Sequence, residues 1–208
     1  MGQLPAYQQL ADGYVLPASL GGHAALDFCN TLAGWGDDQW REYLIDYDAF
    51  AIWAAQAGLV TAGDGRRVRR LAQLEPNVAS TVLAGAKEIR EVLYAICTRS
   101  DRPRDWALLA GHVEAGAAAA RFRRRYGGTT AQWEVPVDVG VVLPLHAVAL
   151  SAGELLATHP LDQVHRCPGR GCGWLFLDRS GRRRWCSMAA CGNREKVRRH
   201  AARHRRPQ

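Results

Sequence analysis

Apolar residues recur at helical spacing through much of residues 1–160, which predicts that this part of the chain is mainly helical. Within residues 23–32, apolar side chains occupy positions i, i+3, i+4 and i+7 from Ala25 to Leu32. The N-cap residue Asp46 and several well-placed prolines mark where further helices begin. These helices are expected at residues 46–58, 64–75, 76–96, 103–122 and 144–158.

A small β content is expected beside these helices. Residues 132–137 alternate between polar and apolar side chains, a pattern typical of a strand. The pair Gly127-Gly128 separates this strand from the helix before it. The first part of the chain is therefore expected to be mainly α with a little β.

Charge is distributed unevenly along the 208 residues, whose formal net charge is +7. Residues 1–160 hold 14 basic and 17 acidic side chains, whereas residues 161–208 hold 13 basic and three acidic ones. We place a domain boundary between these segments, directly after His159-Pro160. A basic terminal domain favours a polyanionic partner. Codon bias in a GC-rich genome explains the preference for Arg over Lys, but not the gathering of charge at one end.

The sequence favours a soluble cytoplasmic protein with no membrane partner. Residues 1–11 lack the cationic and apolar regions of a signal peptide. The longest uncharged apolar run, residues 139–153, is too short to span a bilayer and is interrupted by Pro144 and His146. In a reducing compartment, clustered cysteines are better explained by a bound metal than by disulfides.

Four of the six cysteines form two close pairs. Cys167, Cys172, Cys186 and Cys191 have the spacing C-x4-C-x13-C-x4-C, which can place four thiolates around one Zn²⁺. Four protein ligands leave no open coordination position, so a structural role is expected for the metal. Two alternatives are a pair of disulfides and a site made by the last two cysteines with His200 and His204.

The segments around the cysteines follow the order of a treble-clef zinc finger. Residues 167–172 suit a tight knuckle, and residues 174–177 and 182–186 are expected to form a hairpin. A helix is expected after Cys191. The predicted fold is therefore mainly α with small β (α+β): a helical N-terminal domain at 1–160, followed by a treble-clef-like zinc finger at 161–208.

Short motifs in the same region resemble the CGNR zinc-finger family. They are residues 174–178 (WLFLD), 184–188 (RWCSM) and 191–194 (CGNR). Upstream, residues 22–32 (GHAALDFCNTL) resemble the opening motif of the ABATE domain, which accompanies that finger, with Cys29 where an aliphatic residue is more usual. The resemblance covers essentially the whole chain. It implies a bacterial stress-response transcription regulator with a nucleic-acid-binding finger and a ligand-sensing N-terminal domain.

Two groups of basic side chains are candidates for nucleic-acid contacts, three in the expected hairpin and five on the expected C-terminal helix. Such a helix can follow phosphates or enter a major groove, while Val197 and Ala201 are expected to pack on the hairpin. The segment lacks an exposed aromatic pair for single strands, so duplex DNA is favoured over RNA. The alternative is a solvated, Arg-rich tail. The candidates are Arg182, Arg183, Arg184, Arg194, Lys196, Arg198, Arg199 and Arg203.

The first expected helix carries a row of polar residues. His23, Asp27 and Asn30 share one face at positions i, i+4 and i+7 and could line a pocket for a small ligand. The alternative is that Asp27 and Asn30 form capping or loop-tying hydrogen bonds inside the domain. Cys29 and Cys97 fall on apolar helix faces and are expected in the core.

No P-loop, Rossmann or nucleophile-elbow motif occurs in the sequence, so no enzymatic activity is expected. The leading hypothesis is a DNA-binding regulator whose N-terminal domain senses a ligand or forms a homodimer. One alternative is an RNA-binding protein. Another is a protein-binding finger beside a small-molecule-binding or enzymatic N-terminal domain.

Overall fold

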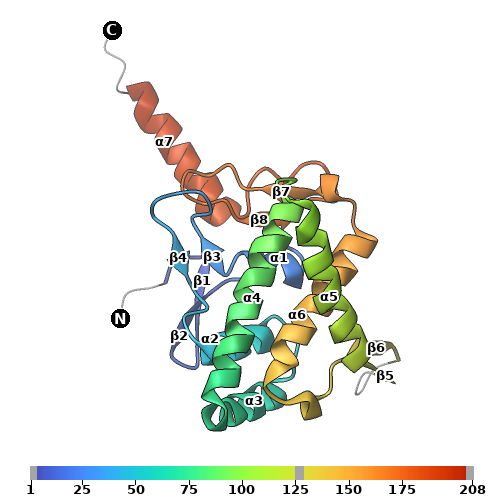
Figure 1. The fold of residues 1–208 in the computed structure, drawn as a ribbon. Helices are drawn as coiled ribbons and strands as arrows, with labels where there is room; N and C mark the ends of the chain where they lie inside the picture. The colour runs from blue at the N-terminus through green and yellow to red at the C-terminus, as the bar shows by residue number, and fades with distance from the viewer. Residues whose placement is uncertain (1–3, 125–128, 205–208) are drawn as a thin grey trace. The chain divides into compact units, whose positions relative to one another are not determined.

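The computed structural model describes residues 4–124 and 129–204, the last two by their backbone only, and it divides into two compact units (Figure 1). The cysteine unit consists of residues 1–43 and 162–208, and the helical unit of residues 44–161. The boundary expected after residue 160 lies next to one of the two points where the chain passes between units. The other point, after Tyr43, shows that the N-terminal segment belongs with the cysteines.

Polar caps and prolines explain where the helices of the helical unit begin. The Asp46 side chain accepts a hydrogen bond from Ala49 N at 2.7 Å, and Thr61 accepts one from Asp64 N at 3.0 Å. Prolines occupy the first turn of the three later helices. The helices are α2 (Tyr47–Gln56), α3 (Ala62–Leu74), α4 (Pro76–Cys97), α5 (Pro103–Ala119) and α6 (Leu143–Thr158), and a 3-10 helix (Val137–Val142) leads into α6.

Helices α4 and α6 supply much of the apolar core. Their fully buried side chains each stabilise the fold by about 1.5–3 kcal/mol, and Cys97 is buried among them, where burial raises the pKa of its thiol to about 12. Among the described residues, one helical stretch, Val137–Thr158, is long and apolar enough to cross a membrane, but 56% of its most apolar window is buried, as in a core helix. The core side chains include Ile89, Leu93, Ile96, Val148 and Leu155.

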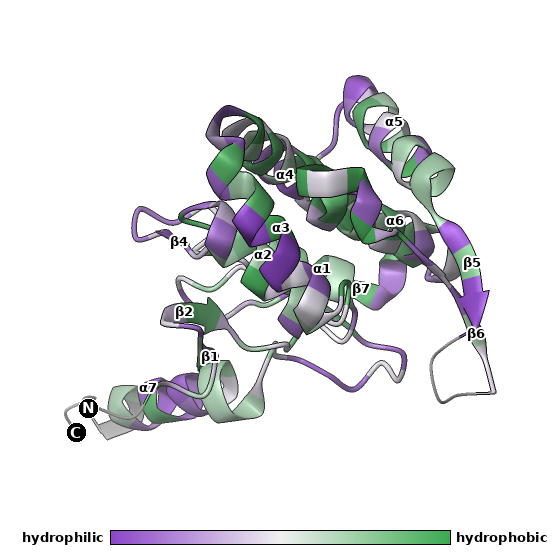
Figure 2. Ribbon diagram, turned by 90° about the horizontal axis from the view of Figure 1, so that it is seen from below, coloured by the Kyte–Doolittle hydropathy of each residue, from purple (hydrophilic) through white to green (hydrophobic). Residues whose placement is uncertain are grey.

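A hairpin follows α5, formed by β5 (Arg121–Arg124) and β6 (Ala131–Glu134). Figure 2 shows it leaving the end of α5 and extending away from the other helices of the unit. The strand expected from residue 132 is confirmed, but the helix expected to reach residue 122 ends at Ala119. Residues 121–124 pair with β6 instead of continuing the helix. The Gly127-Gly128 pair lies outside the described residues.

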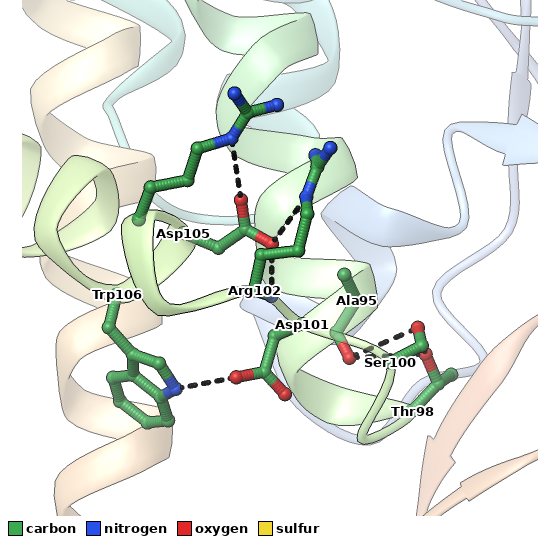
Figure 3. Close-up of polar contacts among 8 residues, drawn as sticks. Ala95, Thr98, Ser100, Asp101, Arg102, Asp105 and Trp106 are labelled. Carbon is green, nitrogen blue, oxygen red and sulfur yellow. Dashed lines mark hydrogen bonds and ion pairs between the residues drawn. The ribbon is translucent and has the colours of Figure 1, made fainter.

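Polar contacts fix the connection between α4 and α5 (Figure 3). The buried Asp105 carboxylate accepts a hydrogen bond from Arg102 N at 2.7 Å and forms ion pairs with the side chains of Arg102 and Arg104. Trp106 Nε1 donates to Asp101 Oδ2 at 2.9 Å. These contacts compensate the buried charge of Asp105 and set the start of α5.

The cysteine unit combines short antiparallel strand pairs with two helices. The Asp12-Gly13 turn, with positive φ at both residues, joins β1 (Gln8–Ala11) to β2 (Tyr14–Pro17). Two more pairs are β3 (Leu32–Ala33) with β4 (Arg41–Glu42) and β7 (Val164–Arg166) with β8 (Leu175–Leu177). The two helices are α1 (Ala24–Cys29) and α7 (Asn193–His204). A π-helical turn (Met188–Gly192) precedes α7, and a short 3-10 turn (Leu161–Gln163) spans the boundary with the helical unit.

Two predictions of secondary structure in this unit are wrong. The first helix ends at Cys29 and does not reach residue 32, because Leu32 pairs with β4. The returning strand expected at 182–186 is absent from the described structure, and β8 pairs with β7 instead. The Asp178 carboxylate folds the segment after β8 into a loop by accepting hydrogen bonds from the amides of Ser180 and Arg183. The other edge of β8 is meanwhile occupied by residues near α1.

Candidate zinc centre and nucleic-acid interface

The four cysteine side chains converge within the cysteine unit. Cys167 and Cys172 lie in the knuckle that connects β7 to β8, Cys186 follows the loop after β8, and Cys191 lies in the π-helical turn before α7. Their Sγ atoms all lie within 4.8 Å of one another, and all four residues are buried. The Sγ atom of Cys186 lies 3.7 Å from that of Cys172 and 3.6 Å from that of Cys191.

These distances fit a tetrahedral zinc site. Four sulfurs bound at about 2.3 Å to one Zn²⁺ lie about 3.8 Å from each other, whereas a disulfide joins sulfurs at about 2.05 Å. All six cysteines are free thiols, which excludes the disulfide alternative for this structure. His200, of the alternative site, is exposed, and the side chain of His204 lies outside the described residues. The metal-type cluster found in the described residues consists of the four cysteines.

The charge state of the four cysteine thiols also favours a bound cation. Hydrogen bonds with Cys172 and Cys186 lower the pKa of the Cys167 thiol to about 7, and hydrogen bonds with the three other cysteines, joined by Arg194, lower that of Cys191 much further. Hydrogen bonds among the four cysteines are also the main cause that raises the pKa of Cys172 and Cys186, and burial and repulsion from a neighbouring thiolate add to the rise. A divalent ion offsets this repulsion and binds all four sulfurs as thiolates.

The surroundings of the cluster are close-packed and largely apolar. A Cβ at Gly169 would lie 3.0 Å from Cys191 Sγ, so the knuckle needs glycine for the two sulfur-bearing turns to approach. Tyr43, Trp174 and Phe176 are buried against the cysteines. On its outer side, the Arg194 guanidinium donates to Cys191 Sγ at 3.0 Å. Such contacts orient a metal ligand and add favourable positive charge beside it.

Residues on either side of α1 bind the edge of β8 that does not pair with β7. Asn30 Nδ2 donates to Leu175 O at 2.9 Å, and Asn30 Oδ1 accepts from Leu175 N at 2.7 Å. Leu177 N donates to Gly21 O at 2.8 Å. Asp27 Oδ1 in turn accepts from the amides of Leu20 and Gly21 at 2.8 and 2.7 Å. The motif at residues 20–30 therefore fixes the strand that carries the zinc knuckle.

This arrangement gives structural roles to the polar row expected to line a ligand pocket. Asn30 and Asp27 are buried and form the loop-tying hydrogen bonds that the sequence left as the alternative. The His23 side chain caps α1 by accepting from Ala25 N at 3.2 Å. Burial raises the pKa of Asp27 to about 6, against the lowering effect of its two backbone donors. Ligand binding by these three residues stays a prediction.

Arg183 differs from the other predicted nucleic-acid contacts, because its guanidinium is used inside the cysteine unit. It donates to the carbonyl oxygens of Trp185, Leu177, Leu20 and Cys186. It also lies over the Phe176 ring, 4.6 Å from the centroid. These contacts tie the loop after β8 to the N-terminal segment, so the structure assigns Arg183 to the architecture of the unit. Its neighbours Arg182 and Arg184 are exposed.

The C-terminal helix α7 is confirmed, and its basic side chains face solvent. Arg194, Lys196, Arg198 and Arg199 are exposed, while the side chain of Arg203 lies outside the described residues. The expectation that Val197 and Ala201 pack on a hairpin is wrong: both are exposed, Val197 to 69%. The hairpin they were expected to cover does not form, and α7 mainly contacts the π-helical turn that precedes it.

Two cavities lie next to charged side chains. One, of about 420 Å³, lies in the cysteine unit beside the knuckle and is lined by residues that include Arg170, Arg194 and Arg198. The other, also about 420 Å³, lies between α4 and α5 in the helical unit. Its lining includes Glu88, Glu91, Val92, Arg102, Arg104 and Asp105. Sequence reasoning found neither, because each depends on residues from separate segments.

Two family models match the chain. The model described as "CGNR zinc finger" matches residues 163–204, and the ABATE model, described as "Putative stress-induced transcription regulator", matches residues 22–159. No curated protein matches the chain. The ABATE match covers more than half of the chain and includes α1 of the cysteine unit as well as the helical unit. The finger match and the four clustered sulfurs together support one structural zinc ion. The chain therefore belongs to the ABATE family and carries a CGNR zinc finger at its C-terminal end.

Proposed function

We propose that the chain is a transcription regulator that binds duplex DNA through α7. The observation that carries the proposal is that α7 begins two residues after the zinc ligand Cys191 and exposes Lys196, Arg198 and Arg199. Zinc fixes the start of the helix to the knuckle, so these basic side chains project from a rigidly held helix. A solvated Arg-rich tail would have no such attachment.

The exposed positive charge near the zinc centre is large enough for several phosphate contacts. Within the helix, Glu195 pairs with Arg198 at 2.7 Å and with Arg199 at 3.9 Å. Exposed ion pairs contribute less than about 1 kcal/mol, so a DNA phosphate can replace Glu195 as partner. Contacts from five of the exposed cations, leaving out Arg194 because it donates to Cys191 Sγ, would give a log–log salt slope of about −4.5. These cations are Arg182, Arg184, Lys196, Arg198 and Arg199.

A helix as the contacting element favours DNA over RNA. The major groove of B-form DNA is about 12 Å wide and admits an α-helix. The major groove of A-form RNA is deep and narrow, and side chains cannot read it. Duplex DNA is therefore the partner in this proposal, and the protein acts in the cytoplasm.

The zinc ion has a structural role in this proposal. Its four protein sulfurs leave no open coordination position for a substrate or water, so we propose no enzymatic step at the metal. Ligand sensing or homodimer formation is assigned to the helical unit in this proposal. The cavity between α4 and α5 is the described site where a small charged ligand would be sought.

A double variant that removes two positive charges tests the proposal against a control that removes the same charge elsewhere. Lys196→Gln/Arg199→Gln removes two exposed cations from α7, and Arg66→Gln/Arg67→Gln removes two exposed cations from α3 in the helical unit. Binding of each protein to labelled duplex DNA, duplex RNA and single-stranded RNA is measured by fluorescence anisotropy across salt. We expect the α7 variant to weaken DNA binding and reduce the salt slope by about 2, while the α3 variant keeps the wild-type slope.

Three outcomes would overturn the proposal. A salt slope near zero on every nucleic acid would remove nucleic-acid binding altogether. Equal losses in the α3 and α7 variants would show that net charge, and not α7, governs binding. Tighter binding to either RNA than to duplex DNA would replace DNA with RNA as the partner.

A further inference from the structure

The β5–β6 hairpin carries two large aromatic side chains that the helical unit leaves uncovered. Phe122 and Trp133 are 63% and 66% exposed. They face each other across the two strands, with ring centroids 5.3 Å apart and planes inclined by 52°. The hairpin extends from the end of α5 (Figure 2) and belongs to the helical unit, whereas the α7 helix proposed above to bind DNA belongs to the cysteine unit. Contiguous exposed aromatic surface of this kind marks interaction sites.

Arginines flank the aromatic pair along β5, with Arg124 on the same face of the ribbon as the rings and Arg121 and Arg123 on the opposite face. Strand β5 reads Arg121-Phe122-Arg123-Arg124, and all four residues are exposed. Arg121 pairs with Asp138 at 3.1 Å, and Arg123 pairs with Glu134 at 3.2 Å, in ion pairs that are open to solvent. Such pairs contribute less than about 1 kcal/mol. A phosphate can therefore take these arginines as partners at little cost.

The size of the patch argues against a protein partner. A standard protein interface buries about 800 Å² on each side, and its centre is depleted of charge. Two aromatic side chains supply about 150–250 Å² each, even when fully buried. The pair is therefore too small and too closely surrounded by arginine to hold a second copy of the chain. Stacking on a nucleotide base needs only a ring face with a cation nearby.

We infer that the β5–β6 hairpin is a second nucleic-acid contact, in which an unpaired or unstacked base stacks on the exposed ring face of Phe122 or Trp133. Arg121, Arg123 and Arg124 then contact the adjacent phosphates. A two-stranded ribbon fits a nucleic-acid groove, and inserted apolar side chains unstack base steps there. The inference rests on the proposed function in that the chain binds nucleic acid, but it uses another unit and another chemistry.

The test removes the rings and leaves the charges in place. Phe122→Ala/Trp133→Ala is compared with Leu74→Ala, which removes an exposed apolar side chain (79%) elsewhere on the helical unit. Full-length proteins are titrated with a labelled continuous duplex, the same duplex with a three-nucleotide bulge, and a single strand. The Lys196→Gln/Arg199→Gln variant is measured in parallel. Circular dichroism and light scattering report fold and oligomeric state.

We expect the hairpin variant to lose at least about fivefold in affinity, with the Leu74→Ala variant unchanged. A loss confined to the bulged and single-stranded probes identifies an unpaired base as the stacking partner. A similar loss on the continuous duplex identifies a base step unstacked within the duplex.

Wild-type affinity of the hairpin variant for all three probes would overturn the inference, while the proposed function stands if the α7 variant loses binding. Loss in the hairpin variant alone would instead overturn the role of α7. A changed oligomeric state with unchanged affinity would make the hairpin a contact between copies, and would also overturn the inference.

Discussion

Substituting Asn30 by alanine removes the side chain that binds the edge of β8 that does not pair with β7. Asn30 is completely buried, and its amide exchanges two hydrogen bonds with the backbone of Leu175, at 2.9 and 2.7 Å. Alanine leaves the N–H and C=O groups of Leu175 buried without these partners, at a cost of about 1–3 kcal/mol each. We therefore expect the free energy of unfolding of the cysteine unit to fall by about 2–6 kcal/mol.

Two measurements follow this change directly. Denaturant titration with a chromogenic zinc chelator reports when the cysteine unit opens, and hydrogen exchange reports protection of the Leu175 amide. The Asn77→Ala variant, at an exposed position on α4, is the matched control and should change stability by less than about 0.5 kcal/mol. A loss below about 1 kcal/mol in Asn30→Ala, together with unchanged exchange at Leu175, would refute the role of this contact.

Three further tests address other contacts of the cysteine unit. Burial raises the pKa of Asp27 from 3.8 to about 6, so the stability contributed by its protonated form is present below pH 3.8 and lost as pH rises through about 6. Asp27→Asn should therefore stabilise the unit at pH 7 by up to about 3 kcal/mol, and this gain in stability should vanish near pH 4. Chemical denaturation measures the gain, and a gain that does not change with pH would contradict the raised pKa of Asp27. Arg183→Gln removes donors to four backbone carbonyls and should lower the free energy of unfolding by at least about 2 kcal/mol, and with it the melting temperature. Arg182→Gln should change the melting temperature little, and equal shifts in the two variants would disprove the structural role of Arg183. Gly173→Ala and Gly181→Ala both place alanine at a positive φ, which costs about 1–2 kcal/mol, but only Gly173→Ala also places a Cβ 2.8 Å from Trp35. The Gly173→Ala protein should therefore have the lower melting temperature. Equal melting temperatures for the two variants would contradict the close packing at Gly173.

The parts of the structure that follow local rules could be predicted from the sequence. The spacing of four cysteines predicts their convergence because thiolates bind zinc in few geometries. The starts of α2, α4 and α5 follow from Asp46, Pro76 and Pro103, since a cap or proline acts within one turn.

The contacts that build the cysteine unit join residues far apart in sequence. Asn30 and Leu175 are separated by 145 positions, and nothing local to either residue indicates the other. The strand expected at 182–186 illustrates the same limit, because its place beside β8 is taken by the Asn30 and Gly21 contacts.

Charge alone also could not separate structural from exposed arginines. Arg182, Arg183 and Arg184 are consecutive residues of the same type, yet of the three Arg183 is the one that contacts the Leu20 carbonyl oxygen and the Phe176 ring. The distinction depends on the loop that Asp178 organises, in which Arg183 N donates to Asp178 Oδ2 at 2.8 Å. That loop is visible only in three dimensions.

Residue-resolved hydrogen exchange of the full chain, before and after removal of zinc by a chelator, tests most directly whether the N-terminal segment and the finger are one zinc-dependent unit. We expect amides of residues 20–31 to lose protection together with those of β8, because Asn30 and Gly21 bind that strand. Amides of α4 and α6 should keep theirs. Continued protection of residues 20–31 after β8 has opened would contradict this account.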